Sequence, residues 1–244
     1  KSIPATAADI DWTALASLAP APGMPDMDAL LARFKGSLWL DHFPSWTSRY
    51  MHPVDGLPDY YRGFTTAIGN AALYANSTAS QAQRKPFVIA LCQMGIDNHA
   101  HMKLGAIWGV NGHCNGRKFP ILFAGKVLGL PELLAAGVTY APTMTRPKGP
   151  GVVPFSEDGQ TFYVQQTSPG VINWGVGNYL PSDVGIAEWG NFHLTGSPTD
   201  YREWANGAGD YRRCCSANGW AGVTLAMRAM GLRLPLTVDA GKAR

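Results

Sequence analysis

The groups best suited to chemistry gather in residues 111–118, which combine amide, imidazole and cationic side chains. These groups belong to Asn111, His113, Asn115, Arg117 and Lys118. Two glycines in the same stretch let the backbone come close to whatever these side chains face. Donors at the entrance of a helix bind anions well, because the helix N-terminus carries partial positive charge. The stretch therefore predicts a site for a negatively charged substrate, and a carboxylate-bearing sugar suits its donors.

Other residues could contact such a substrate. The candidate binding residues are Trp108, Asn115, Lys118, Arg146, Tyr211 and Arg212. Trp108 could form a platform for a sugar ring, although most tryptophans belong to the core. Tyr211 and Arg212 open the last expected helix, where the arginine could equally pair with Glu188 or Asp210.

Metal-ligating and acidic groups are less well placed. His99 and His101 could bind a metal together with His113, but residues two apart on a helix point to different sides. We therefore expect no metal and no cofactor. Glu157 and Asp158 precede an expected strand, and we interpret them as a solvated turn rather than as a general acid and base.

The composition is that of a globular protein. Of 244 residues, 46% are hydrophobic and 15% charged, enough for a sizeable core. The net charge of +3 lacks the dense basic face of a nucleic-acid binder, and no run of about 18 apolar residues predicts a membrane span. The four cysteines have no metal-site spacing and are expected to be buried thiols, while a disulfide from Cys114 to Cys214 or Cys215 stays open. Because the chain starts at Lys1, we expect a secreted or periplasmic protein whose signal peptide has been removed.

Hydrophobic periodicity and capping residues predict a mainly α-helical fold. The expected helices cover residues 26–34, 59–75, 79–104, 118–128, 131–136, 199–204 and 211–232, with Asp26 capping the first and Gly137 closing the fifth. The strand signal is limited to residues 161–166, within a long loop region rich in Gly, Pro and Ser. We interpret residues 1–26 as an extended lead-in and residues 27–244 as a single catalytic domain of helical hairpins joined by long loops.

Three segments, residues 112–125, 157–164 and 211–222, carry a resemblance to a known group of proteins. They resemble secreted bacterial polysaccharide lyases with an (α/α) toroid, nearest to the alginate and glucuronan lyases such as polysaccharide lyase family 38. The resemblance implies an (α/α) toroid fold and an anionic polysaccharide partner. The chain is shorter than such toroids. Three alternatives follow: a partial toroid, a trimmed form, or a smaller helical relative.

The activity implied by the resemblance is β-elimination from a uronic-acid-containing polysaccharide, in which the C5 proton of a uronate is removed and the sugar at O4 is expelled. Asn111 and His113 would then bind the carboxylate, Arg117 would clamp the charge, and Tyr163 would transfer the proton. A tyrosine needs a nearby cation to act as a base at neutral pH, because its ordinary pKa is about 10. Arg117, Arg146 or Arg212 could supply that cation.

Three other functions stay open. A glycoside hydrolase on the same scaffold would use paired carboxylates among Glu157, Asp158, Asp183 and Glu188. A non-catalytic glycan-binding protein would rely on aromatic platforms alone. Metal-dependent hydrolysis would use the three histidines named above.

Overall fold

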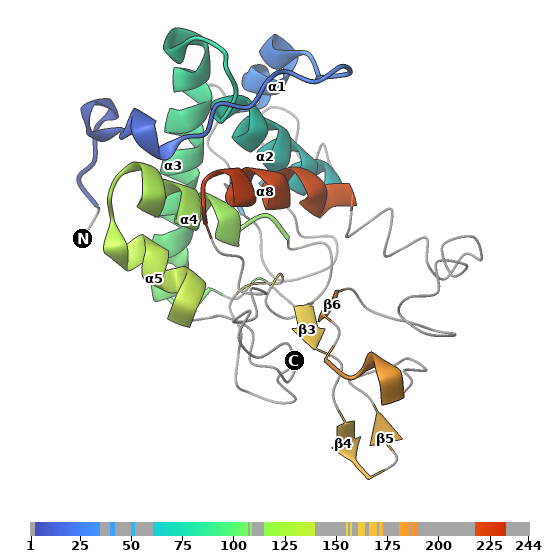
Figure 1. The fold of residues 1–244 in the computed structure, drawn as a ribbon. Coiled ribbons are helices and arrows are strands. Elements are labelled where there is room, and N and C mark those ends of the chain that lie inside the picture. Colours follow the sequence, from blue (N-terminus) through green and yellow to red (C-terminus); the bar gives the residue numbers. More distant parts are fainter. Residues whose placement is uncertain are drawn as a thin grey trace.

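The fold is given by a computed structural model, shown in Figure 1. The structure describes residues 3–34, 40–41, 50–51, 61–106, 108, 115–139, 155, 157, 161–163, 166–169, 171–172, 181–185, 187–189 and 218–232. Within these residues the fold is mainly helical, as the sequence predicts. The principal helices are α1 (Met27–Phe34), α2 (Tyr61–Ala75), α3 (Gln81–Lys103), α4 (Lys118–Val127), α5 (Pro131–Thr139) and α8 (Asn218–Ala229).

The long helix α3 lies beside α2 and α4 and forms the spine of the core (Figure 1). It begins with a capping box, in which the Ser80 side chain accepts from the Gln83 backbone N–H and the Gln83 side chain accepts from that of Ser80. This reciprocal pair satisfies two backbone donors that the helix leaves unpaired. Pro86 lies early in α3 and does not end the helix.

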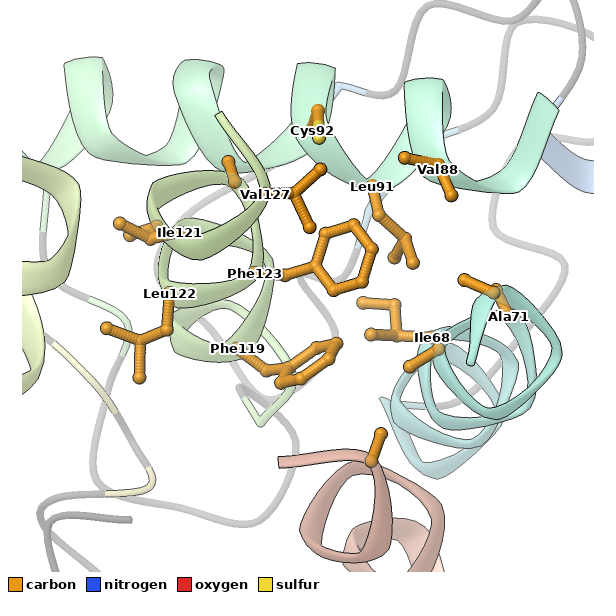
Figure 2. Close-up of a cluster of buried hydrophobic side chains, with 14 of the residues drawn as sticks. Ile68, Ala71, Val88, Leu91, Cys92, Phe119, Ile121, Leu122, Phe123 and Val127 are labelled. Atoms are coloured by element: carbon orange, nitrogen blue, oxygen red, sulfur yellow. The ribbon is translucent and has the colours of Figure 1, made fainter. Parts of the chain in front are cut away.

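The core fills the space between α2, α3 and α4. In Figure 2 the ring of Phe123 and the side chains of Leu91 and Ile68 point toward one another from these three helices. All three side chains are fully buried. Burying one such side chain contributes about 1.5–3 kcal/mol, so this contact surface is a main source of stability. Cys92 is a thiol in the same cluster, and burial raises its pKa to about 12.

Two glycine contacts bring helix axes unusually close. On α3, a Cβ at Gly95 would lie only 2.1 Å from the carbonyl oxygen of Pro120 in α4. Between α2 and α8, a Cβ on Gly222 would lie 3.1 Å from the Cα of Gly69. A side chain at Gly95 would force α3 and α4 apart, whereas one at Gly222 would make only a tight contact with α2.

The N-terminal segment is fastened to the helices. It contains two short 3-10 helices, η1 (Ala7–Asp9) and η2 (Trp12–Ala14). The Asp11 backbone N–H donates to the Val127 carbonyl at the end of α4, over 2.8 Å. Asn76, which follows α2, is buried and accepts through its side chain from the Ala16 backbone N–H, over 2.7 Å. These bonds tie residues before α1 to the ends of α2 and α4.

Strands are short and occur as antiparallel pairs. β1 (Leu40–Asp41) pairs with β2 (Tyr50–Met51), β3 (Thr161–Tyr163) with β6 (Ala187–Trp189), and β4 (Gln166–Ser168) with β5 (Val171–Ile172). A third 3-10 helix, η4 (Pro181–Asp183), precedes β6. The expected strand at residues 161–166 is thus split between β3 and β4.

Most expected helices within the described residues are confirmed. Asp26 accepts from the Ala29 backbone N–H at the start of α1, as expected of a cap. The expected closure by Gly137 is wrong, because α5 continues to Thr139. The described part of the last helix starts at Asn218, and residues 211–217, the helix at 199–204 and Asp59 lie outside the described residues. Among the described residues, no helix has the length and apolar character needed to cross a bilayer.

Candidate functional site

The candidate site is the turn formed by Asn115, Gly116, Arg117 and Lys118, which leads into α4 and is called here the 115–118 turn. The side chains of three residues bind its backbone. Asn98 of α3 donates through Nδ2 to the Arg117 carbonyl over 3.1 Å, and Arg117 itself donates to the Asn115 carbonyl over 2.8 Å. A carboxylate from later in the chain binds two N–H groups of the turn. Side chains therefore bind the backbone of the turn at four polar atoms, one in each of its four residues.

That carboxylate belongs to Glu157, whose Oε1 accepts from the Gly116 N–H over 2.7 Å and from the Lys118 N–H over 3.3 Å. An acidic group is well placed here, because the N-terminus of α4 carries partial positive charge. Burial raises the pKa of Glu157 above its ordinary value, whereas the hydrogen bonds from Gly116 and Lys118 and the charge of Lys118 act in the opposite direction. The prediction of a solvated turn at Glu157 is therefore wrong.

Arg117 is a buried cation. Its side chain is 1% exposed, and the guanidinium carbon lies 3.9 Å from the centre of the Phe64 ring on α2. A planar guanidinium stacks well on an aromatic face and is weakly hydrated, which lowers the cost of burying it. The arginine thus joins α2 to the start of α4 through both stacking and hydrogen bonding.

Three further side chains form an aromatic and cationic layer beside the turn. The rings of Trp108 and Phe155 stack with centroids 5.4 Å apart and planes 8° from parallel. The Lys118 ammonium lies 5.5 Å from the centre of the Phe155 ring. All three residues are buried, so in this structure Trp108 is packed against protein and does not present an open face to solvent.

Asn115 differs from its neighbours in the turn. The residue is 1% exposed, yet neither its Nδ2 nor its Oδ1 makes a hydrogen bond within the part of the chain that the structure describes. A buried amide without partners costs about 1–3 kcal/mol, and native proteins keep few such groups. This side chain is the feature of the site that most clearly calls for a ligand.

The structure brings together four of the predicted site residues, Trp108, Asn115, Arg117 and Lys118. Tyr163 lies in β3, opposite Ala187 in the strand register. The remaining predicted residues, Asn111, His113, Arg146, Tyr211 and Arg212, lie outside the described residues. The anion position expected at the entrance of α4 is filled by Glu157 from within the chain.

Sequence reasoning missed three residues that build the site. Asn98, Phe64 and Glu157 all reach the turn from distant parts of the chain. No local pattern marks Asn98 or Phe64, since each lies in an ordinary helical sequence. The sequence marks Glu157 as an acidic residue before a strand and as a candidate carboxylate of a hydrolase, but spacing does not identify its partners in the turn.

The histidines considered for metal binding lie on different sides of α3. His99 is buried, whereas His101, two residues later, is exposed. Burial lowers the pKa of His99, with a smaller contribution in the same direction from the charge of Lys103 and an opposing one from Glu132. His113 lies outside the described residues.

A separate pocket of about 230 Å³ lies between the N-terminal segment, α2 and α8. Its walls are mainly apolar and include Leu18, Met24, Tyr74 and Leu225. None of the predicted site residues lines it, so it is distinct from the 115–118 turn.

Comparison of the chain with protein-family models, with curated proteins and with solved structures finds no match.

Proposed function

We propose that the protein is a polysaccharide lyase that cleaves a uronic-acid-containing polysaccharide by β-elimination. The observation that carries the proposal is the buried Asn115 amide, which makes no hydrogen bond among the described residues. Its neighbours in sequence are the cations Arg117 and Lys118. An amide offers both donors and an acceptor, so it can bind a sugar carboxylate or a sugar hydroxyl.

The charge of the uronate carboxylate must be neutralised before a base can remove the C5 proton. The C5 proton of a uronate is weakly acidic while the adjacent carboxylate keeps its charge, and the enolate-like transition state adds further negative charge. In the proposed mechanism Asn111 and His113 neutralise the carboxylate, aided by the field of Arg117, and Asn115 binds the sugar beside them. Preorganised donors of this kind supply a large share of catalytic power. Tyr163 takes the C5 proton and protonates the departing O4 oxygen.

The proposed architecture is an (α/α) toroid, complete or partial. Consecutive helices α2 and α3 contact each other, as do α4 and α5, and such pairs are the units from which a toroid is built. The substrate would follow the loops at one end of these pairs, where the 115–118 turn lies at the start of α4.

The test uses the full chain with alginate, glucuronan, pectate and a neutral glucan. A lyase releases unsaturated uronates, which are detected by their ultraviolet absorbance, from at least one acidic polymer and none from the neutral glucan. Asn115→Ala should lower kcat/KM by about a hundredfold, the usual effect of removing one preorganised donor. Asn70→Ala, on α2 away from the turn, serves as the control. Saturated products, or full activity in Asn115→Ala, would refute the proposal.

A glycoside hydrolase is the second candidate, and the raised pKa of Glu157 is the observation that favours it. A carboxyl group whose pKa is raised by burial holds its proton more tightly, which is what a general acid requires. The hydrolase would release saturated sugars and would lose activity in Glu157→Gln. The lyase would keep most of its activity in that variant, because the glutamine oxygen can still accept from Gly116 and Lys118.

A further inference from the structure

We infer that Glu157 is a positioning residue, whose Oε1 accepts from two N–H groups of the 115–118 turn and so holds the Asn115 amide in place for the substrate. The inference rests on the proposed function, in which Asn115 binds the sugar. It assigns Glu157 a role that differs from proton donation, and it rests on three sets of contacts.

The first contacts are the two hydrogen bonds to a single oxygen. Glu157 Oε1 accepts from the N–H groups on both sides of Arg117, those of Gly116 and Lys118. One oxygen that binds two N–H groups fixes the orientation of both peptide planes. The Gly116 backbone has a φ of +92°, a conformation that side-chain-bearing residues rarely adopt. Glycine adopts this conformation without strain, so the turn can offer both N–H groups to the carboxyl oxygen.

A second set of contacts fastens Phe155 close by. Phe155 is fully buried, stacks on Trp108 and receives the Lys118 ammonium on its ring. Phe155 and Glu157, together called the clasp, therefore contact the chain before the turn, the turn itself and the first residue of α4. The clasp lies about forty residues after the turn in the sequence, so its contacts with the turn close a long loop of the chain.

The third observation concerns the Asn115 side-chain amide, which makes no hydrogen bond to the clasp. Asn98 and Arg117 donate to the carbonyl groups of Arg117 and Asn115, and Glu157 accepts from the N–H groups of Gly116 and Lys118. The Asn115 side chain takes part in none of these bonds. A rigid backbone that carries an unsatisfied amide is the arrangement expected of a preorganised binding group.

Amide hydrogen exchange, measured by NMR, tests the link between Glu157 and the turn. In Glu157→Ala, exchange at the Gly116 and Lys118 amides should become about tenfold faster or more, because local opening is no longer opposed by the carboxylate. Glu157→Gln keeps an acceptor and should stay within about threefold of the wild type. Glu132→Ala removes an exposed glutamate on α5 and is the matched control. Unchanged exchange in Glu157→Ala would overturn the inference.

The side-chain amide signals of Asn115 test the positioning role, with sodium glucuronate as the probe. Glucuronate should shift these signals in the wild type and in Glu157→Gln, and should shift them much less in Glu157→Ala. A purely structural glutamate would leave the shift intact in every folded variant, which would overturn the positioning role. If Glu157→Ala does not fold, Glu157→Asp replaces it, since the shorter side chain cannot reach both N–H groups in the same way.

The two proposals fail in different ways. If glucuronate causes no shift at Asn115 in the wild type, the proposed function fails and the positioning role falls with it, while the exchange measurement still decides whether Glu157 orders the turn. If the wild type binds and cleaves uronates but Glu157→Ala keeps the wild-type kcat/KM, the proposed function stands and the positioning role is refuted.

Discussion

Gly95 of α3 lies directly against the Pro120 carbonyl of α4, so closely that a Cβ at position 95 would stand 2.1 Å from the carbonyl oxygen and 2.8 Å from the Ala124 Cβ. Gly95→Ala should therefore destabilise the fold, although alanine is the better helix former by about 1 kcal/mol. The clash is with backbone, which cannot move aside, and overpacking of this kind costs about 3 kcal/mol.

The measurement for Gly95→Ala is urea unfolding followed by circular dichroism. Gln93→Ala, at an exposed position of the same helix, should change the free energy of unfolding by only about 0.5 kcal/mol. A Gly95→Ala protein as stable as the wild type would contradict the close contact between Gly95 of α3 and the Pro120 carbonyl of α4.

Arg117→Lys tests the stacking of a buried cation on Phe64. Lysine keeps the charge but lacks the planar group that lies 3.9 Å from the ring centre and donates to the Asn115 carbonyl. A desolvated cation–π contact contributes about 2 kcal/mol, and we expect a loss of similar size in the free energy of unfolding. Arg228→Lys, at an exposed site on α8, is the control and should be neutral. Equal stability of the two variants would argue against the stacking.

How far the sequence predicts this fold depends on the range of the contacts. The helix α2 could be predicted because its apolar residues recur at helical spacing, and α4 because it is a continuous apolar run, and both are local signals. The end of α5 could not, since Gly137 fits a helix terminus equally well. The clustering of donors at residues 115–118 was visible in the sequence. The burial of Arg117 and the use of Glu157 were not, because both depend on partners far away in the chain.

His99 should make the protein less stable in acid. Burial lowers its pKa in the folded state below the ordinary 6.5, so the unfolded state binds the proton more tightly. The stabilising contribution is complete above pH 6.5 and is lost as the pH falls below that value. His99→Gln should show a shallower loss of unfolding free energy over this window. His101→Gln, at the exposed position on the same helix, should keep the wild-type slope, and a shallower slope there would contradict the assignment.

Glu157 should make the protein less stable as the pH rises, which is the opposite of the effect of His99. Because its pKa is raised in the folded state, the native protein binds this proton more tightly than the unfolded chain does. Its contribution is complete below the ordinary pKa of 4.5 and is lost as the pH rises through the folded-state value. Relative to Glu157→Gln, the wild type should thus lose stability as the pH rises above 4.5. Unfolding at several pH values measures this difference, and a constant gap between the two proteins would refute it.

Tyr163→Phe tests the proposed proton transfer. Removal of the hydroxyl should lower kcat by about a hundredfold or more, the usual contribution of a positioned acid or base, with little change in KM. Phe162→Leu, at the neighbouring position of β3, is the control for damage to the strand. Ultraviolet detection of product gives both constants. An unchanged kcat in Tyr163→Phe would assign the proton transfer to another residue.

The contact between Gly69 and Gly222 has a consequence for synthesis on the ribosome. The partner of α2 emerges about 150 residues after α2 itself, a delay on the order of ten seconds at ordinary translation rates. During that interval α8 is not yet present to cover the surface of α2 that it contacts in the folded protein. The packing of α2 is complete only after α8 has been made and has docked. Nascent chains of this protein should therefore expose this surface to chaperones that bind apolar helices until α8 has been made.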